Sequence, residues 1–340
     1  MCPALAMATI PTSDQFTGCL LGLALGDALG APVEAYPPEE ARRYVALLSE
    51  GTVPARGPQG RGFGQVTDDT QLARELLLSI VEHGLFDPAA FAGRLLELVA
   101  SGQLVGAGPA TLAAARQLAL GRPWHEAGVP APYAGNGAAM RAGPLGLMYG
   151  RDPRRLVRAV VDQARVTHHD PRSTAGAVAI AGAVAIASRQ GALDPVRFLD
   201  EIAEWMEPVD AGFAGSIRGL GDWAHLAPEQ AATALAERGL EPEAREGWHG
   251  VSSFVVSSVC WSLYAFLQAP EDFWGAVRVA IEVGGDTDTL AAMTGAISGA
   301  RLGFGALPAD LVGHINDAGA WPAQELADLA RRLHLIVTAE

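Results

Sequence analysis

The stretch GCLLGLALGDALGAPVE, residues 18–34, places glycine at positions 18, 22, 26 and 30 of an otherwise apolar segment. A spacing of four residues puts these glycines on one face of a helix, although each glycine inside a helix costs about 1 kcal/mol relative to alanine. Such a stripe lets helix axes approach closely, so the stretch predicts a helix packed densely inside a large helical core. Dense packing does not explain Asp27 inside the segment or Glu34 just after it.

Stripes of small residues recur further along the chain. Residues 289–301, TLAAMTGAISGAR, again carry two glycines four positions apart, Gly295 and Gly299, and residues 176–187 contain the hexamer GAVAIA twice in succession. This doublet has no copies elsewhere, which argues against a repeat protein. The sequence therefore predicts at least three helices that pack through small residues.

Helical periodicity extends over most of the chain, whereas alternating strand patterns are scarce. The predicted fold class is therefore all-α. No Ser/Gly linker or charge block divides the chain, so its length allows one compact unit or two. We predict helices over about 14–30, 39–49, 69–83, 88–104, 109–120, 137–149, 152–166, 172–190, 194–206, 228–238, 251–268, 271–283, 288–302, 308–318 and 322–337.

The composition is that of a well-packed acidic protein. Hydrophobic residues make up 49% of the 340 residues and charged residues 18%, which is enough to bury a large core and excludes a disordered chain. All 24 basic residues are arginine, and 38 acidic residues leave a net charge of -14. We therefore expect no nucleic-acid partner, because such a partner needs a basic face, and the acidic balance suits cation binding.

The cysteines and the N-terminus favour a cytoplasmic protein. Cys2, Cys19 and Cys260 are odd in number and widely spaced, and they form no C-x-x-C pattern, which favours a reducing compartment. The first thirteen residues contain no basic residue, so they do not resemble a signal peptide. The most membrane-like segment, 173–188, is shorter than the span of about 20 residues that a membrane needs. We predict a buried helix there, and no membrane partner.

Two acidic clusters lie at predicted helix starts. The first is VTDDTQ, residues 66–71, and the second is GGDTDT, residues 284–289. Either cluster alone would be explained by helix capping, because Thr and Asp are good N-caps and carboxylates are favoured in a first turn. Together they offer more than caps need, namely four carboxylates and two hydroxyls, from Thr67, Asp68, Asp69, Asp286, Asp288 and Thr289.

Four carboxylates brought together would repel one another unless protons or cations neutralised them. Two divalent ions would cancel this charge, and oxygen ligands favour Mg²⁺, Mn²⁺ or Ca²⁺ over Zn²⁺. Gly284 and Gly285 allow a tight turn just before the second cluster. We therefore predict a dinuclear Mg²⁺ or Mn²⁺ site that joins segments about 220 positions apart.

Two further motifs could bind a substrate. The glycine-rich AGNGAAMR, residues 134–141, is predicted to run into a helix near Ala138, and free N–H groups at such a start cradle phosphate or another anion. Gly-Asn-Gly is also an ordinary turn. The motif THHD, residues 167–170, could ligate a metal, act as an acid or base, or stack on a ligand ring, although a histidine pair near a helix end is more often structural.

Taken together, these motifs resemble the ADP-ribosylglycohydrolase family. The resemblance rests on GDALGAPVE with Glu34, TDDT at 67–70, GNGAAMR at 135–141, His168 after it, and GGDTDT at 284–289. The motifs occur in the family's order and span roughly residues 18–300. The resemblance implies a compact multi-helix orthogonal bundle, forming one domain over residues 1–340 with a flexible N-terminus at 1–13, and a two-metal site at the bottom of a cleft.

The same resemblance implies roles for individual residues. The six residues of the two acidic clusters would hold two Mg²⁺ or Mn²⁺ ions, on which the distal ribose of ADP-ribose would lie. Glu34 would be a mobile acidic group beside the metals, and Glu34 or Asp68 would assist proton transfer. Asp27 would make a buried, structural hydrogen-bonded contact. The diphosphate would rest on the glycine-rich motif, with His168 close by, which makes the predicted substrate-binding residues Gly135, Asn136, Gly137, Ala138, Ala139, Met140, Arg141 and His168.

The implied enzyme is a dinuclear metal-dependent glycosidase. It would cleave the N- or O-glycosidic bond between ADP-ribose and an acceptor, with an ADP-ribosylated protein as the expected partner. Two alternatives stay open: a catalytically silent ADP-ribose-binding or structural member of the family, and a two-metal phosphoesterase that acts on the diphosphate. Residues 203–250 match none of the family's motifs, and the acceptor, arginine, serine or another group, is left open.

Overall fold

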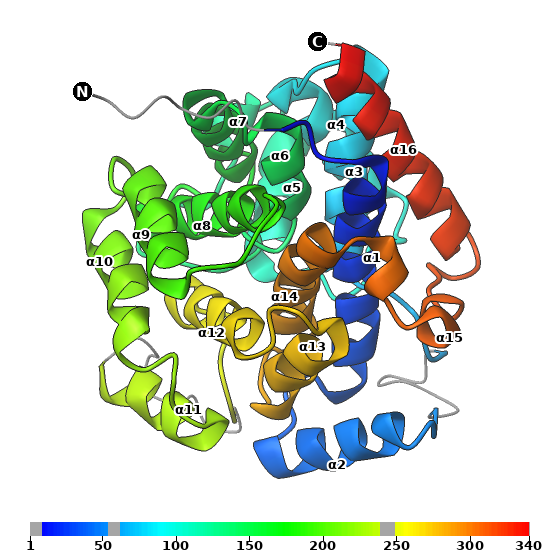
Figure 1. Ribbon diagram of the computed structural model, residues 1–340. Helices are drawn as coiled ribbons and strands as arrows, with labels where there is room; N and C mark the ends of the chain where they lie inside the picture. Colours follow the sequence, from blue (N-terminus) through cyan, green and yellow to red (C-terminus); the bar gives the residue numbers. More distant parts are fainter. Residues whose placement is uncertain (1–8, 54–61, 239–248, 340) are drawn as a thin grey trace.

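Helix α1 (Ser13–Gly30) is buried from Phe16 to its C-terminal end, as its apolar sequence predicts. It begins with a capping box in which the Thr12 hydroxyl accepts from the Gln15 N–H and the Gln15 side chain accepts from the Thr12 N–H. In Figure 1, α1 runs through the middle of the molecule beside α14 (Thr287–Leu302), its most extensive partner. These two helices form the centre of the core.

The glycines of α1 are required because its backbone touches the backbone of α14. A Cβ atom added to Gly22 would lie 2.3 Å from the carbonyl oxygen of Gly295, and one added to Gly295 would lie 2.1 Å from the carbonyl oxygen of Gly22. Gly18 and Gly299 oppose each other in the same way, at 2.3 and 2.0 Å. The stripes at 18–30 and 295–299 are therefore two halves of one contact.

The computed structural model describes residues 9–53, 62–238 and 249–339. Within these ranges the chain forms sixteen α-helices and no β-strand, only isolated bridges, which confirms the all-α prediction. Besides α1 and α14, the helices are α2 (Pro38–Ser49), α3 (Asp68–His83), α4 (Pro88–Ala100), α5 (Pro109–Ala119), α6 (Gly143–Tyr149), α7 (Pro153–Arg165), α8 (Pro171–Ala187), α9 (Pro195–Met206), α10 (Ala211–Gly219), α11 (Pro228–Glu237), α12 (Val255–Gln268), α13 (Phe273–Glu282), α15 (Ala309–Val312) and α16 (Ala323–Ala339).

Two helices begin later than the sequence predicts. The helix predicted over 137–149 starts at Gly143, because residues 136–142 form turns in which the Asn136 carbonyl accepts from the N–H groups of Ala139 and Met140. The expectation of a helix start near Ala138 is therefore wrong. The helix predicted over 251–268 starts at Val255, since the preceding residues pair with the backbone around Gly285 and Asn136.

Two other segments also differ from the predictions. Helix α10 was not predicted, and its three glycines within nine residues explain why its periodicity is weak. The helix predicted over 308–318 ends at Val312 as α15. The chain then pairs with another segment: the N–H of Asn316 donates to the Gly64 carbonyl, and its own carbonyl accepts from Val66. Long-range backbone pairing therefore decides these boundaries.

The apolar helices were compared with the length and composition that a membrane span requires. The segment 173–188 lies almost entirely in α8 and is buried, which confirms the prediction of a buried helix there. Ser13–Val33 is long and apolar enough to cross a membrane by length and composition, yet 89% of that window is buried inside the protein. The helix that has the length and composition of a membrane span is therefore the central core helix α1.

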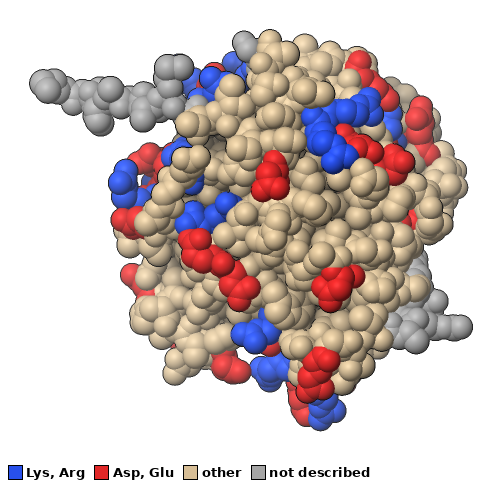
Figure 2. All heavy atoms as spheres, turned by 45° about the vertical axis from the view of Figure 1, so that its right-hand side comes forward, with Lys and Arg blue, Asp and Glu red and all other residues tan. Residues whose placement is uncertain are grey.

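On the face drawn in Figure 2, arginines occur in small groups interspersed with acidic residues.

Some sequence-based expectations fall partly outside the described residues. Residues 1–8, within the predicted flexible N-terminus, and Cys2 lie outside them, whereas Cys19 and Cys260 are free and buried. Of the unmatched region 203–250, α10 and α11 are described, and Trp223 is buried against the ring of Tyr264.

Candidate active site

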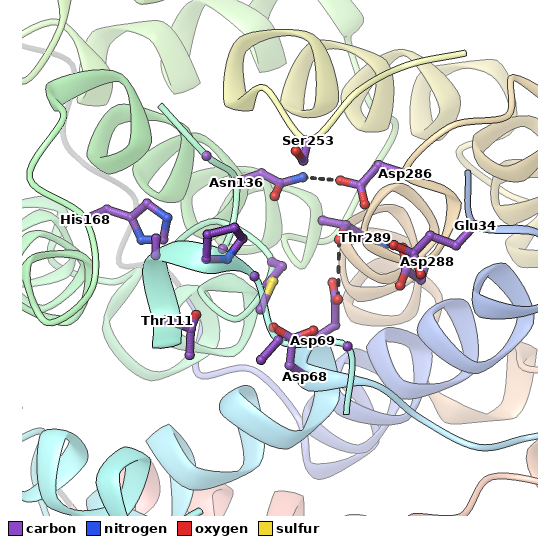
Figure 3. A pocket seen from close by; sticks show the side chains of 18 of the residues that line it. Glu34, Asp68, Asp69, Thr111, Asn136, His168, Ser253, Asp286, Asp288 and Thr289 are labelled. Carbon is purple, nitrogen blue, oxygen red and sulfur yellow. Dashed lines mark hydrogen bonds between the residues drawn. The ribbon is translucent and has the colours of Figure 1, made fainter. Parts of the chain in front are cut away.

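The N-termini of three helices, α3, α5 and α14, meet at one cavity of about 270 Å³. This volume is close to the lower limit for small-molecule sites. The cavity brings together both acidic clusters and part of the glycine-rich motif (Figure 3). Its lining consists of Glu34, Asp68, Asp69, Gly106, Ala107, Gly108, Pro109, Ala110, Thr111, Tyr133, Gly135, Asn136, Gly137, Met140, His168, Ser253, Asp286, Asp288 and Thr289.

Asp27 fixes the start of α3 to the middle of α1. Its carboxylate accepts hydrogen bonds from the backbone N–H of Thr67 at 3.0 Å and of Thr70 at 3.1 Å. It also accepts from the hydroxyls of Thr67 and Thr70, at 2.9 and 2.5 Å. The predicted structural role of Asp27 is confirmed, and the residue is fully buried. Burial raises its pKa to about 6, while the hydrogen bonds from Thr70 and Thr67 oppose the rise.

The two acidic clusters meet at the cavity, as the sequence predicts. The Thr289 hydroxyl donates to the Asp69 carboxylate at 3.3 Å, across 220 residues of sequence. Carboxylate oxygens of Asp69 and Asp288 lie within 4.8 Å of each other and of Asp27. Oxygens of Glu34, Asp286 and Asp288 form a second such group within the same distance. The contact between α1 and α14 explains this placement, because the Thr287 hydroxyl donates to the Gly30 carbonyl at the end of α1.

The carboxylates of this cluster favour their protonated forms unless positive charge is supplied. Burial, and then the neighbouring Asp27, raises the pKa of Asp68 to about 7. Burial also raises the pKa of Asp69 and of Asp288 well above the ordinary value. The negative charge of Asp27 adds to the rise for Asp69, and that of Glu34 adds to the rise for Asp288. Like charges that share a buried site cannot all ionise without compensation. The cluster can therefore attract cations strongly.

One oxygen of the cluster has no partner. The Oδ1 atom of Asp69 is buried and accepts no hydrogen bond from any residue that the structure describes. Buried polar atoms in folded proteins are almost always satisfied, so an orphaned carboxylate oxygen calls for a bound group. Oxygen-only ligands of this kind suit Mg²⁺, Mn²⁺ or Ca²⁺. The residues present therefore fit a divalent cation.

The glycine-rich motif contributes only part of its residues to the cavity. Gly135, Asn136, Gly137 and Met140 line it, whereas Ala138, Ala139 and Arg141 are fully buried and are not part of its lining. The Asn136 amide donates to the Asp286 carboxylate at 2.5 Å, so this side chain orients an acid of the cluster. The backbone N–H of Asn136 donates a hydrogen bond to the Ser253 carbonyl, which fixes the position of the residue.

Arg141 has a structural position instead of the predicted substrate contact. Its guanidinium donates to the Gln163 side chain at 2.7 Å, to the Gly137 carbonyl at 2.8 Å and to the Thr167 hydroxyl at 2.8 Å. Burial lowers its pKa to about 9. The residue ties the turn at 136–142 to α7 and to the segment that carries His168. A substrate cannot reach it without displacing these contacts.

His168 lies at the far side of the cavity from the acidic cluster (Figure 3). Its Nδ1 atom lies 2.8 Å from the Thr167 hydroxyl, and its ring centroid is 6.1 Å from that of Tyr133. Burial, and then the charge of Arg141, lowers the pKa of His168 to about 3. The imidazole is therefore neutral at pH 7, and it can offer a hydrogen bond or a ring face but no charge.

Sequence reasoning missed one wall of the cavity, residues 106–111. The Gly108 N–H donates to the Asp68 carboxylate, and Gly106 adopts a left-handed backbone with a φ of 77° beside the same residue. The sequence does contain a local pattern here: Gly-Ala-Gly-Pro at residues 106–109 precedes a helical pattern, and this combination indicates a helix start. Gln71 was also missed, although its amide holds this wall in place by accepting from the Val105 N–H at 2.8 Å.

The family model described as ADP-ribosylglycohydrolase matches residues 8–339. The chain therefore belongs to the ADP-ribosylglycohydrolase family, a class of glycohydrolases that act on ADP-ribose conjugates. This confirms the resemblance noted in the sequence and the predicted enzyme class.

Curated relatives and a solved structure agree with this assignment. The chain is similar to the ADP-ribosylhydrolase ARH3 of Danio rerio, with 28% identity over 97% of this chain and 93% of the relative. It is also similar to the ADP-ribosylarginine hydrolase Tri1 of Serratia proteamaculans, with 26% identity over 87% of this chain and 73% of the relative. A solved structure described as an ADP-ribosylglycohydrolase-related protein complex superimposes with a TM-score of 0.71 at 29% identity, over 96% of this chain and 98% of the other.

Proposed function

We propose that this chain is a dinuclear metal-dependent hydrolase that cleaves the N- or O-glycosidic bond between ADP-ribose and an acceptor and releases ADP-ribose. The observation that carries the proposal is the meeting of Asp69, Asp288 and Glu34 at one cavity, in a chain whose relatives hydrolyse ADP-ribose conjugates. The expected partner is a protein that carries ADP-ribose, in keeping with the names of those relatives.

The acidic cluster would hold two divalent cations, Mg²⁺ or Mn²⁺. The proposed ligands are Thr67, Asp68, Asp69, Asp286, Asp288 and Thr289, and the unpartnered Oδ1 atom of Asp69 supports this assignment. When bound, such ions act as Lewis acids that position hydroxyl groups of a sugar and stabilise negative charge. Asn136 would keep the Asp286 carboxylate oriented for this purpose through its hydrogen bond.

Glu34 and Asp68 are the proposed groups for proton transfer. Both border the cavity, and they come from different elements: Asp68 from the first turn of α3, and Glu34 from the turn that follows α1. Glu34 is only partly buried, so it can exchange protons with solvent, whereas Asp68 is buried. A carboxylate within reach of the attacking water or of the leaving group would move the proton that bond cleavage requires.

The experiment that tests the proposal is an assay of peptides that carry arginine-linked or serine-linked ADP-ribose. The full chain is incubated with each peptide in the presence of Mg²⁺, Mn²⁺ or a chelator, and the products are identified by mass. We expect intact ADP-ribose, dependent on the cation, from at least one peptide. AMP would instead indicate a phosphoesterase, and tight binding of ADP-ribose without turnover would indicate a silent binding protein.

A variant of the cluster ties the activity to the proposed site. Asp288→Asn should lower the hydrolysis rate by about a hundredfold or more, because it removes a charged ligand of the cluster. The control is Glu201→Gln, which removes only an ion pair with Arg189 on the surface of α9 and should leave the rate unchanged. Equal rates for Asp288→Asn and the unmodified chain would overturn the site assignment.

A further inference from the structure

Helix α7 and the turn before it concentrate positive charge in an acidic protein. The whole chain has a net charge of -14, yet residues 151–165 contain five of its 24 arginines and only two aspartates, which gives this stretch a net charge of +3. The stretch is therefore opposite in charge to the molecule as a whole. Its arginines are Arg151, Arg154, Arg155, Arg158 and Arg165.

These arginines lie on one exposed side of the helix. Each residue of an α-helix is rotated by about 100° from the one before, so the four arginines inside α7 fall within an arc of about 100°. Arg151 precedes the helix by two residues, and all five arginines are exposed. Figure 1 shows α7 at the outer edge of the molecule, with α6 and α8 as its neighbours. We call these five residues the arginine face. The opposite side of α7 is buried and consists of Leu156, Ala159, Val160, Gln163 and Ala164.

Most of the charge on the arginine face is not neutralised by nearby carboxylates. Several exposed arginines elsewhere form ion pairs, as Arg189 does with Glu201 at 2.7 Å. Asp162 lies on the same side of α7 as the arginines, so it offsets one of their charges. Within the ranges that the structure describes, no ion pair is formed by Arg151, Arg154, Arg158 or Arg165.

The size of the arginine face favours a short anionic partner. From Arg154 to Arg165 it is about 17 Å long, a distance that an extended chain of about five residues spans. At physiological ionic strength, exposed charges more than about 8 Å apart are largely screened from each other. A short acidic segment would therefore interact with the arginine face and little with the acidic remainder of the surface. A membrane or a long nucleic acid would face that remainder as well, and would be repelled by it.

We propose that the arginine face of α7 is a docking surface for an acidic segment of a partner protein. Guanidinium groups bind carboxylates through paired hydrogen bonds, which gives such a contact its geometry as well as its charge complementarity. The described lining of the cavity includes no residue of α7. The proposal is therefore independent of the reaction proposed for the acidic cluster.

The helix that presents these charges is held firmly from behind. The fully buried Gln163 side chain accepts from the Arg141 guanidinium at 2.7 Å and donates to the Ala138 carbonyl at 2.9 Å. On the exposed side, the Arg155 guanidinium lies 4.8 to 5 Å from the Tyr149 ring, at 4.9 Å from its centroid. The spacing of the arginines is thus set before a partner binds, which lowers the entropic cost of binding.

The test measures the binding of fluorescein-labelled decaglutamate to the full chain by fluorescence anisotropy, with decaglutamine as the uncharged control peptide. We expect decaglutamate to bind and decaglutamine not to bind. Raising the NaCl concentration from about 0.05 M to about 0.5 M should weaken the binding strongly, because salt screens exposed charges. The triple variant Arg151→Gln, Arg154→Gln, Arg158→Gln should weaken it about tenfold or more, because three charge contacts are lost.

A second triple variant controls for the change in net charge. Arg116→Gln, Arg197→Gln, Arg332→Gln removes the same charge from three exposed arginines on the separate helices α5, α9 and α16. These arginines form no ion pair with any residue that the structure describes. Binding of decaglutamate should weaken less than about twofold in this control. If the first triple variant does not fold, Arg158→Gln alone replaces it, with an expected loss of about twofold or more.

Three results would overturn the proposal. The first is that decaglutamate does not bind the unmodified chain at low salt. The second is an equal loss of binding in both triple variants, because net charge and not the arginine face would then explain it. The third is that phosphatidylserine vesicles or a single-stranded DNA oligonucleotide bind more tightly than decaglutamate and lose this binding in the first triple variant. That result would assign the arginine face to a membrane or to a nucleic acid.

Discussion

At the scale of single residues, the same side chain takes different roles according to its partners. Asp27 and Asp69 are both buried carboxylates within 4.8 Å of Asp288. The Asp27 carboxylate accepts from Thr67 and Thr70, so its hydrogen-bonding capacity is used within the protein. Asp69 leaves one oxygen without a partner. Asp27 is therefore suited to stabilising the folded structure, and Asp69 is suited to binding a ligand.

Asp27→Asn should destabilise the protein by about 2–4 kcal/mol, because the amide would turn a donor toward groups that are themselves donors, and because bonds to a charged acceptor are lost. The free energy of unfolding in urea, with chelator present, measures this change. Glu201→Gln, on the surface, is the matched control and should change it by less than about 0.5 kcal/mol. An unchanged midpoint for Asp27→Asn would contradict the structural role.

At the scale of helices, the contact between α1 and α14 determines where the site forms. The two backbones touch at Gly22 and Gly295, and the ends of the helices bring Glu34 and Asp288 together. Close backbone packing of this kind leaves no room for a methyl group. The cost of glycine within α1 is offset by the contacts that the close approach permits.

Gly22→Ala should therefore destabilise the protein by about 3 kcal/mol or more, because its Cβ would lie 2.3 Å from a backbone carbonyl oxygen that cannot move freely. Gly93→Ala, within α4, is the matched control, since no atom lies within 4 Å of the added Cβ. This control should stabilise the protein by about 0.5–1 kcal/mol through helix propensity. Denaturation in urea measures both variants, and equal effects would contradict the contact.

At the scale of the whole molecule, the buried acids couple stability to pH and to cations. The folded-state pKa of Asp68 is about 7, above the ordinary 3.8, and those of Asp69 and Asp288 are also raised, in each case mainly by burial. The folded chain thus holds protons that the unfolded chain has released at neutral pH. Their contribution to stability is present at low pH and is lost as the pH rises through the folded-state values.

Between about pH 7 and 8, where Asp68 loses its remaining proton in the folded state, the metal-free protein should become less stable, and its melting temperature should fall rather than rise. In this range the low pKa of His168 no longer matters, because that ring is neutral in both the folded and the unfolded state. Mg²⁺ or Mn²⁺ should raise the melting temperature, and more so at the higher pH. Thermal unfolding after chelator treatment measures this, and a melting temperature that rises with pH would contradict it.

Much of the site could be predicted from the sequence because its chemistry is local. Asp68 and Asp69 are adjacent, and Asp286 and Asp288 share one turn. The sequence alone therefore shows that these clusters contain more acidic side chains than helix capping requires. The wall at 106–111 could not be assigned in the same way. Its glycines and Thr111 are ordinary residues whose meaning depends on their neighbours across the cavity.

The all-α class, the positions of most helices and the set of acidic residues that meet were determined by the sequence alone. Helical periodicity and clusters of like charge act within a few residues, so a linear pattern records them. Only the tertiary structure decided that residues 137–142 form turns, that Arg141 is structural and that α5 points into the cavity. These features depend on backbone pairing and burial between segments that are far apart in the chain, which no local pattern encodes.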